Sequence, residues 1–201
     1  MEMNEGYPVI APGPIFMHQM TQGYLDLRDQ RDRLGYDYWQ NSLNAHRANA
    51  AFCARHEQRF ASYRGGVWGL NASDTPDGYG VRAPHEGQHD GTVCPTGAVA
   101  GLPFVPELSR RAIREIYERY SSHLWGAYGF ADAFNADRDW WDPDVIGIDL
   151  GMVLVAIEDA RTGFVWRLMA GSPIIRRGLR AAGFQHTEEP QPRQVRVPPH
   201  P

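Results

Sequence analysis

Glycine and proline divide this chain into helical segments separated by long, irregular loops. The 201 residues include 21 glycines and 15 prolines, which are densest in residues 1–14, 65–106 and 185–201, whereas 125–146 is a second loop rich in aromatic and acidic residues. Glycine costs conformational entropy in a regular element and proline removes a backbone donor, so such clusters exclude long helices and strands. The chain can therefore form regular structure only between these clusters.

Six stretches outside the glycine and proline clusters, or between their breakers, have the spacing of a helix with an apolar face. They are 15–29, 36–57, a short segment after Pro95, 107–124, 147–170 and 174–183. No alternation of strands with helices is visible, so the sequence predicts an all-α domain with at most one small hairpin, around Tyr79 to Val93. The first half of 147–170 is apolar on nearly every face, which predicts a helix buried between neighbours.

The two ends of the chain differ from the segment between them. Residues 1–14 contain several glycines and prolines and are predicted to be an extended lead-in, and 185–201 is proline-rich with little to bury, which predicts disorder. The domain is therefore expected to span 15–184. No basic segment followed by an apolar one opens the chain, so no secretory signal is predicted.

Composition narrows the classes of function. A net charge of −4 without a basic block lacks the electrostatic footprint of a nucleic-acid-binding protein. No apolar run approaches the roughly 18 to 20 residues that span a bilayer, so no membrane partner is predicted. Two cysteines, Cys53 and Cys94, are too few for a disulfide scaffold; buried free thiols are the favoured interpretation and a single bridge is the alternative.

Asp149 is the most informative single residue, because it lies one turn into an otherwise apolar helical segment. A buried carboxylate is costly unless partners hold it. Two interpretations follow: a general base that faces a cavity near a helix N-terminus, or an aspartate that serves only the structure, as a helix cap or a hydrogen-bond acceptor. Glu158 lies about half a turn out of phase with Asp149, so an ion pair with Arg161 is predicted for it instead.

Both loops place flat aromatic rings beside directional polar groups. The residues concerned are Trp68, Asn71, Asp74, Asp77 and Tyr79 in the first loop, and Trp125, Tyr128, Phe134, Asn135, Trp140 and Trp141 in the second. A sugar packs its C–H faces on aromatic rings while its hydroxyl groups need fixed hydrogen-bond partners. The loops therefore predict a carbohydrate ligand, and the alternative is that these rings only pack the loops onto the domain.

The segment HEGQH at 85–89 matches a zinc-protease motif formally. That motif needs a helix to bring His85 and His89 onto one face with Glu86 between them, and Pro84 and Gly87 oppose a helix here. We therefore predict no metal and no cofactor. Phosphate-binding and serine-hydrolase motifs are also absent from the sequence.

Several blocks resemble those of the bacterial glucoamylase-like (glycoamylase) family, which is related to endo-β-1,2-glucanases and cyclic β-1,2-glucan synthases. The resemblance covers 15–184 in unbroken order. Its blocks are GYLDLRDQRDRLGYDYWQNS, GVWGLNASDTPDGYG, DGTVCPTGAVAGLPFVPE, LWGAYGFADAFN, IGIDLGMVLVAIEDARTGFVWRLM and IIRRGLRAAGF.

This resemblance implies a glycosidase that acts on a β-glucan, with an (α/α)6 barrel whose loops line a glycan cleft. It would make Asp149 the catalytic base and place Trp68, Asn71 and Asp74 beside the sugar. Asp132 and Asn135 would border the cleft. Family members are often exported or periplasmic, and the residues themselves predict no location for this chain.

The resemblance also implies that the chain corresponds to the C-terminal half of the family domain, because about six helices are expected here and twelve in the full barrel. The family's Tyr-Ser-Glu block, with its plausible general acid, has no counterpart, and Gly65 and Gly66 stand where the family often has Glu-Asn. Hydrolysis would then need an acid from a missing half, in a second chain or an upstream segment. The alternative function is a catalytically silent glycan-binding remnant.

Overall fold

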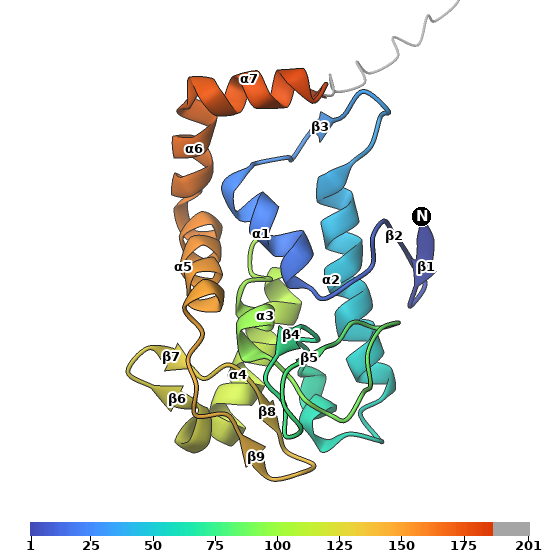
Figure 1. Cartoon of the computed structure of the whole chain (residues 1–201), viewed down its shortest axis with the longest axis vertical. Coiled ribbons are helices and arrows are strands. Elements are labelled where there is room, and N and C mark those ends of the chain that lie inside the picture. Colours follow the sequence, from blue (N-terminus) through green and yellow to red (C-terminus); the bar gives the residue numbers. More distant parts are fainter. Residues whose placement is uncertain (187–201) are drawn as a thin grey trace, which may run out of the picture.

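The computed structural model describes residues 1–186, and most of the segment predicted to be disordered, 187–201, lies outside the described residues. Figure 1 shows α2 as one column and α5 with α6 as another, with α1 between them and α7 lying crosswise at the top. The α-helices are α1 (Phe16–Tyr24), α2 (Tyr38–Arg55), α3 (Pro95–Val99), α4 (Pro106–Leu124), α5 (Gly147–Thr162), α6 (Phe164–Gly171) and α7 (Pro173–Ala181). A 3-10 helix, η1, covers Ala61–Gly66.

The helices lie where the apolar spacing predicts them, and local chemistry sets their ends. The Asp37 carboxylate accepts a hydrogen bond of 2.8 Å from the Gln40 amide and so caps α2. The first helix ends at Tyr24, earlier than expected. The segment 147–170 is two helices, because Gly163 adopts a left-handed conformation with φ of 65° that separates α5 from α6.

Ten short strands, which the all-α prediction did not contain, join the loops as five antiparallel pairs. They are β1 (Glu2–Asn4), β2 (Tyr7–Val9), β3 (Gln30–Arg31), β4 (Ala72–Ser73), β5 (Gly80–Val81), β6 (Trp125–Gly126), β7 (Gly129–Phe130), β8 (Phe134–Asn135), β9 (Trp140–Trp141) and β10 (Gln185–His186). The predicted hairpin between 79 and 93 is wrong in register, because β5 pairs with β4, which lies upstream of it. Strands of two or three residues are too short to show an alternating pattern in sequence.

The hydrophobic core lies between α2, α4 and the loop segments from 60 to 105. Its largest buried side chains include Trp68, Tyr63 and Phe134. His46 is also completely buried there, stacked on Phe104 with ring centroids 4.5 Å apart. Loop segments therefore supply much of the core, and they are fixed by it.

The prediction that α5 is buried between neighbours is wrong. Its inner side packs on α1 and α3, whereas Ile148 and Leu154 on its outer side are exposed. Apolar residues on all faces of a helix predict burial on all faces, but within residues 1–186 only one side of this helix is covered. An exposed apolar face also continues along α6 through Phe164 and Leu168.

Three smaller predictions concern single side chains. Cys53 and Cys94 are free and buried, which confirms the favoured interpretation. Glu158 and Arg161 form an ion pair at 3.6 Å, as predicted. The segment 85–89 is a turn and not a helix, and His89 packs against Phe52.

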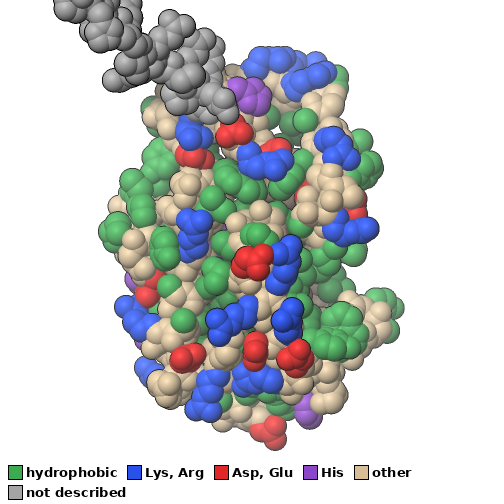
Figure 2. All heavy atoms as spheres, turned by 180° about the vertical axis from the view of Figure 1, so that it is seen from behind, with side chains coloured by type: hydrophobic (Ala, Val, Ile, Leu, Met, Phe, Trp, Pro, Cys, Tyr) green, Lys and Arg blue, Asp and Glu red, His purple; other side chains and the backbone are tan. Residues whose placement is uncertain are grey.

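The outer surface carries charges of both signs. Figure 2 shows basic and acidic side chains interspersed over the face opposite to that of Figure 1. Among the helices described within 1–186, none combines the length and the apolar character needed to cross a membrane.

Gly69 allows a close approach that fixes the segment leading to β4. Its φ is +147°, and a Cβ atom there would lie 2.3 Å from the Cys94 carbonyl oxygen. We expect Gly69→Ala to lower the free energy of unfolding by roughly 2 kcal/mol or more, because backbone must move. Gly126→Ala is the matched control, since a Cβ there meets nothing within 4 Å. Urea unfolding measures both, and equal midpoints for the two variants would contradict this account.

Candidate active site

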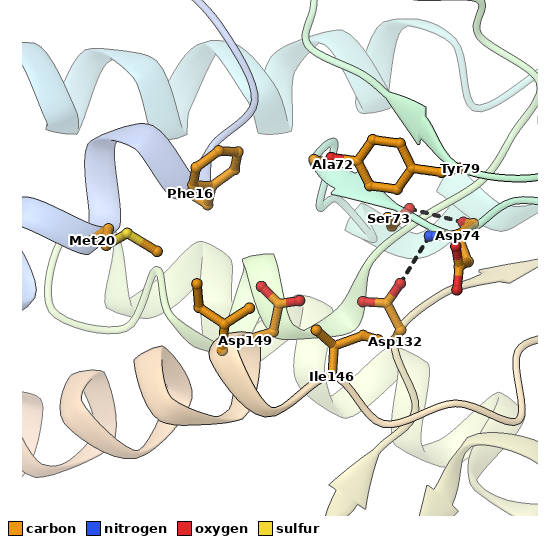
Figure 3. Close-up of a pocket in the computed structure, with 10 residues that line it drawn as sticks. Phe16, Met20, Ala72, Ser73, Asp74, Tyr79, Asp132, Ile146 and Asp149 are labelled. Atoms are coloured by element: carbon orange, nitrogen blue, oxygen red, sulfur yellow. Dashed lines mark hydrogen bonds between the residues drawn. The ribbon is translucent and has the colours of Figure 1, made fainter.

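A cavity of about 250 Å³ opens where four separate segments of the chain meet. Figure 3 shows side chains from α1, from the β4–β5 hairpin, from the segment between β7 and β8, and from the start of α5 around it. The lining residues are Phe16, Met20, Ala72, Ser73, Asp74, Tyr79, Asp132, Ile146, Ile148 and Asp149. Three carboxyl groups and one tyrosine ring thus share a small space with apolar side chains.

Asp149 lies in the first turn of α5, and its carboxyl group points into the cavity (Figure 3). The residue that caps the helix is Ile146, so Asp149 is not a helix cap. The side chain is buried, with 8% of the residue exposed. Burial raises the pKa of Asp149, and a hydrogen bond with the Asp132 carboxyl group opposes that rise.

Asp132 connects the other two acids of the cavity. It is only 2% exposed, and its Oδ2 atom accepts a hydrogen bond of 2.9 Å from the Asp74 backbone amide. Burial raises the pKa of Asp132 to about 6, and the neighbouring carboxyl groups of Asp149, Asp142 and Asp74 add to the rise. Asp132 is therefore a carboxyl group that gains a proton far more easily than an exposed aspartate does.

The chain holds Asp132 in place through its backbone. The Asp132 amide donates to the Asp144 carbonyl oxygen at 3.0 Å, and the Asp142 amide donates to the Ala133 carbonyl oxygen at 3.1 Å. Two residues further on, Phe134 exchanges two backbone hydrogen bonds with Val93. The second loop is thus anchored to the core on both sides of its acidic residue.

Three of the sequence-predicted site residues, Asp74, Asp132 and Asp149, come together at this cavity, but five do not. Trp68 is in the core with 1% of its surface exposed, and its indole N–H donates to the Leu108 carbonyl oxygen. Asn71 is buried and accepts from the Phe16 amide, which holds the start of α1. Asn135 is buried, donates to the Asp90 carbonyl oxygen of the first loop and accepts from the Asp137 and Arg138 amides of its own loop. These three side chains have no surface open to a ligand, which corrects their assignment.

The other two residues are exposed but lie elsewhere on the surface. Asp77 forms an ion pair with Arg138 that links the two loops. Tyr128 is 75% exposed at the turn between β6 and β7 and does not line the cavity. Both residues lie outside this cavity for the same reason: a shared loop does not place a side chain at a shared site.

Several residues of the cavity were not predicted as site residues. Phe16 and Met20 belong to the apolar face of α1, where sequence alone indicates only packing. Tyr79, by contrast, is one of the first-loop rings that the sequence analysis placed beside a sugar, and it is exposed at the rim of the cavity. Asp142, buried beside Asp132, could have been suspected only from the acidic composition of its loop.

With this geometry described, known proteins provide a comparison. The glycoamylase family model, described as "Putative glucoamylase", matches residues 1–173. The chain belongs to the glycoamylase family. This confirms the resemblance seen in the sequence blocks.

Relatives of this glycoamylase-family chain include characterised hydrolases. It is 34% identical over 167 residues to an exo β-1,2-glucooligosaccharide sophorohydrolase (non-reducing end) of Parabacteroides distasonis, which covers 83% of this chain and 23% of that protein. It is similar to the endo-β-1,2-glucanase of Chitinophaga pinensis, with a TM-score of 0.81 and 34% identity over 86% of this chain and 41% of the other. A β-1,2-glucanase of Parabacteroides distasonis gives a TM-score of 0.80 and 33% identity over 85% of this chain and 24% of the other. The chain thus spans less than half the length of these relatives.

The charge state of Asp132 is directly measurable. In metal-free buffer we expect its carboxyl group to titrate with a pKa of about 6, because burial disfavours the ionised form. Since the unfolded pKa is lower, this group stabilises the fold less as pH rises through 6. Carboxyl carbon shifts in NMR measure the titration, with Asp77 as the control, whose pKa is held low by Arg138. Ordinary titration of Asp132 near pH 4 would show that this account of its burial is wrong.

Proposed function

We propose that this chain carries the base side of a glycoside hydrolase site that acts on a β-1,2-linked glucan. The observation that supports this most directly is a buried carboxyl group, Asp149, at the start of a helix and facing a cavity rimmed by Tyr79. The relatives named above are hydrolases of β-1,2-glucans, which supports the linkage. Asp149 would accept a proton from the water that attacks the anomeric carbon.

Asp132 acts in this proposal as a positioning residue for Asp149. A glycosidase normally separates its two carboxyl groups by about 5 to 5.5 Å or by about 6.5 to 9.5 Å, so that they flank the scissile bond. The Asp132 and Asp149 carboxyl groups share one cavity and influence each other's ionisation, which we take as a supporting contact and not as a pair that flanks the scissile bond. We therefore assign the general acid to the part of the family fold that this chain does not span.

The finer architecture belongs to the same proposal. A chain that superimposes with TM-scores of 0.82 and 0.86 on 43% and 46% of two solved relatives corresponds to about half of a larger helical domain. We propose that this half is one side of an (α/α) barrel. The exposed apolar side of α5 and α6 supports the proposal, because a complete barrel would have further helices packed beside them.

A segment that binds glycan without hydrolysing it is the second candidate. Our assignment of the general acid to a part of the family fold that this chain does not span favours this candidate for the isolated chain. The two candidates differ in turnover and agree in binding at the cavity.

Asp149→Asn tests the catalytic assignment. We expect it to lower the rate at which reducing ends are released from β-1,2-glucan by about 100-fold or more, because an amide cannot accept the proton from water. The assay uses the chain together with the matching N-terminal half of a family member. Asp77→Asn is the control, since that carboxylate is exposed and outside the cavity. Equal loss in both variants, or no loss in Asp149→Asn, would contradict the assignment.

Tyr79→Ala tests where the sugar binds. Calorimetry with a β-1,2-glucooligosaccharide should show weaker binding by about 1 kcal/mol, roughly a fivefold rise in Kd, since the variant loses one face of ring packing. Tyr128→Ala, an equally exposed tyrosine remote from the cavity, should bind as the parent does. If the sugar binds but the Asp149 assay detects no turnover in the parent chain, the second candidate function is the correct one. If only Tyr128→Ala weakens binding, the sugar binds at the β6–β7 turn and not at the cavity.

A further inference from the structure

Next to Asp149, three other aspartates gather into one cluster, of which the hydrolytic proposal uses only Asp132. One carboxylate oxygen each of Asp74, Asp132 and Asp142 lies within 4.8 Å of the other two. Asp132 and Asp142 are 2% and 4% exposed, and Asp74 is half-buried at the edge of the cavity. Figure 3 shows Asp74 and Asp132 on one side of that cavity.

The backbone fixes these three carboxyl groups near one another. Asp132 and Asp142 belong to two segments joined by the hydrogen bonds from the Asp132 amide to Asp144 and from the Asp142 amide to Ala133. Asp74 is tied to them by its own amide, which donates to Asp132 Oδ2. The three groups cannot separate without breaking these bonds.

Asp142 has an oxygen atom aimed at no partner. Its Oδ1 atom accepts from the Asp144 amide at 3.0 Å, whereas Oδ2 is buried and makes no hydrogen bond with any described residue. A buried carboxylate oxygen without a donor costs free energy that a native structure normally recovers. The free oxygen thus leaves one buried acceptor of the cluster available to a ligand.

Several aspartates of the chain are paired with an arginine, whereas among the described residues the three aspartates of the cluster are not. Within residues 1–186, ion pairs join arginines to several aspartates; these are Asp26 with Arg28, Asp37 with Arg31, Asp77 with Arg138 and Asp90 with Arg82. No arginine forms such a pair with Asp74, Asp132 or Asp142 among the described residues. The neighbouring charges that act on Asp132 are all carboxyl groups.

We propose that Asp74, Asp132 and Asp142 bind a calcium ion. Carboxylate oxygens suit hard cations, and two oxygens bound to one Ca²⁺ lie up to about 4.6 to 5.2 Å apart, twice the bond length. Three oxygens within 4.8 Å of one another meet that limit without movement. Calcium accepts six to eight oxygen ligands in a flexible arrangement, whereas magnesium demands a near-ideal octahedron, so an irregular set of carboxylates from three segments suits calcium better. Water from the adjoining cavity completes the coordination, and the ion neutralises charge beside Asp149.

Calorimetry of the EDTA-stripped chain with calcium chloride tests the site. We expect the parent to bind one Ca²⁺ per chain. Asp142→Asn replaces the carboxylate that carries the unpartnered Oδ2 atom by an amide, and should bind calcium at least tenfold more weakly. Asp77→Asn removes the same charge from an exposed position and should bind calcium as the parent does. Absence of calcium binding, or equal binding by Asp142→Asn, would overturn the proposal. Magnesium binding as tightly as calcium would overturn the choice of ion.

A second measurement covers the case in which Asp142→Asn does not fold. Terbium luminescence on the unmodified chain, excited through Trp141 next to Asp142, should appear on addition of Tb³⁺ and fall when Ca²⁺ competes. Asp74→Asn, at the half-buried edge, should reduce the terbium signal several-fold. Luminescence that calcium does not displace would contradict the site. No sugar is present in either experiment, so these results are independent of the hydrolysis assay.

Discussion

The cavity depends on the contacts of one buried carboxyl group, Asp132. It accepts the Asp74 amide from the first loop, its backbone joins the segment before α5, and its carboxyl group meets that of Asp149. Three segments far apart in sequence are therefore held at one point. Burial of the ionised Asp132 carboxyl group costs free energy, and the hydrogen bond from the Asp74 amide offsets only part of that cost. The pKa of Asp132 is therefore raised.

This arrangement explains why the loops, and not the helices alone, define the site. Gly69 and Cys94 approach through their backbones, and Phe134 pairs with Val93, so the two loops are packed as tightly as the core. The helices supply two walls, through the start of α1 and the start of α5. A rigid loop framework of this kind can hold carboxyl groups in a fixed relation to a bound sugar.

The sequence predicts the helices well because their apolar spacing is a local signal. The same is true of Asp149, whose position within an apolar helix is evident without the fold. Trp68 and Asn135 could not be placed in this way, because inward packing and backbone hydrogen bonds decide whether a loop side chain faces a ligand or the core. Asp142 and Asp132 share a loop in the sequence, but their proximity depends on a strand pairing that two-residue strands do not reveal.

The central claim is that a glucan binds in the cavity with Asp149 at the reacting centre. A crystal structure of the chain with a β-1,2-glucooligosaccharide is the most direct measurement. The account predicts a glucose ring against Tyr79 and a sugar or water oxygen within hydrogen-bond distance of the Asp149 carboxylate. An oligosaccharide bound elsewhere on the described surface, with Asp149 contacting only protein atoms, would contradict it.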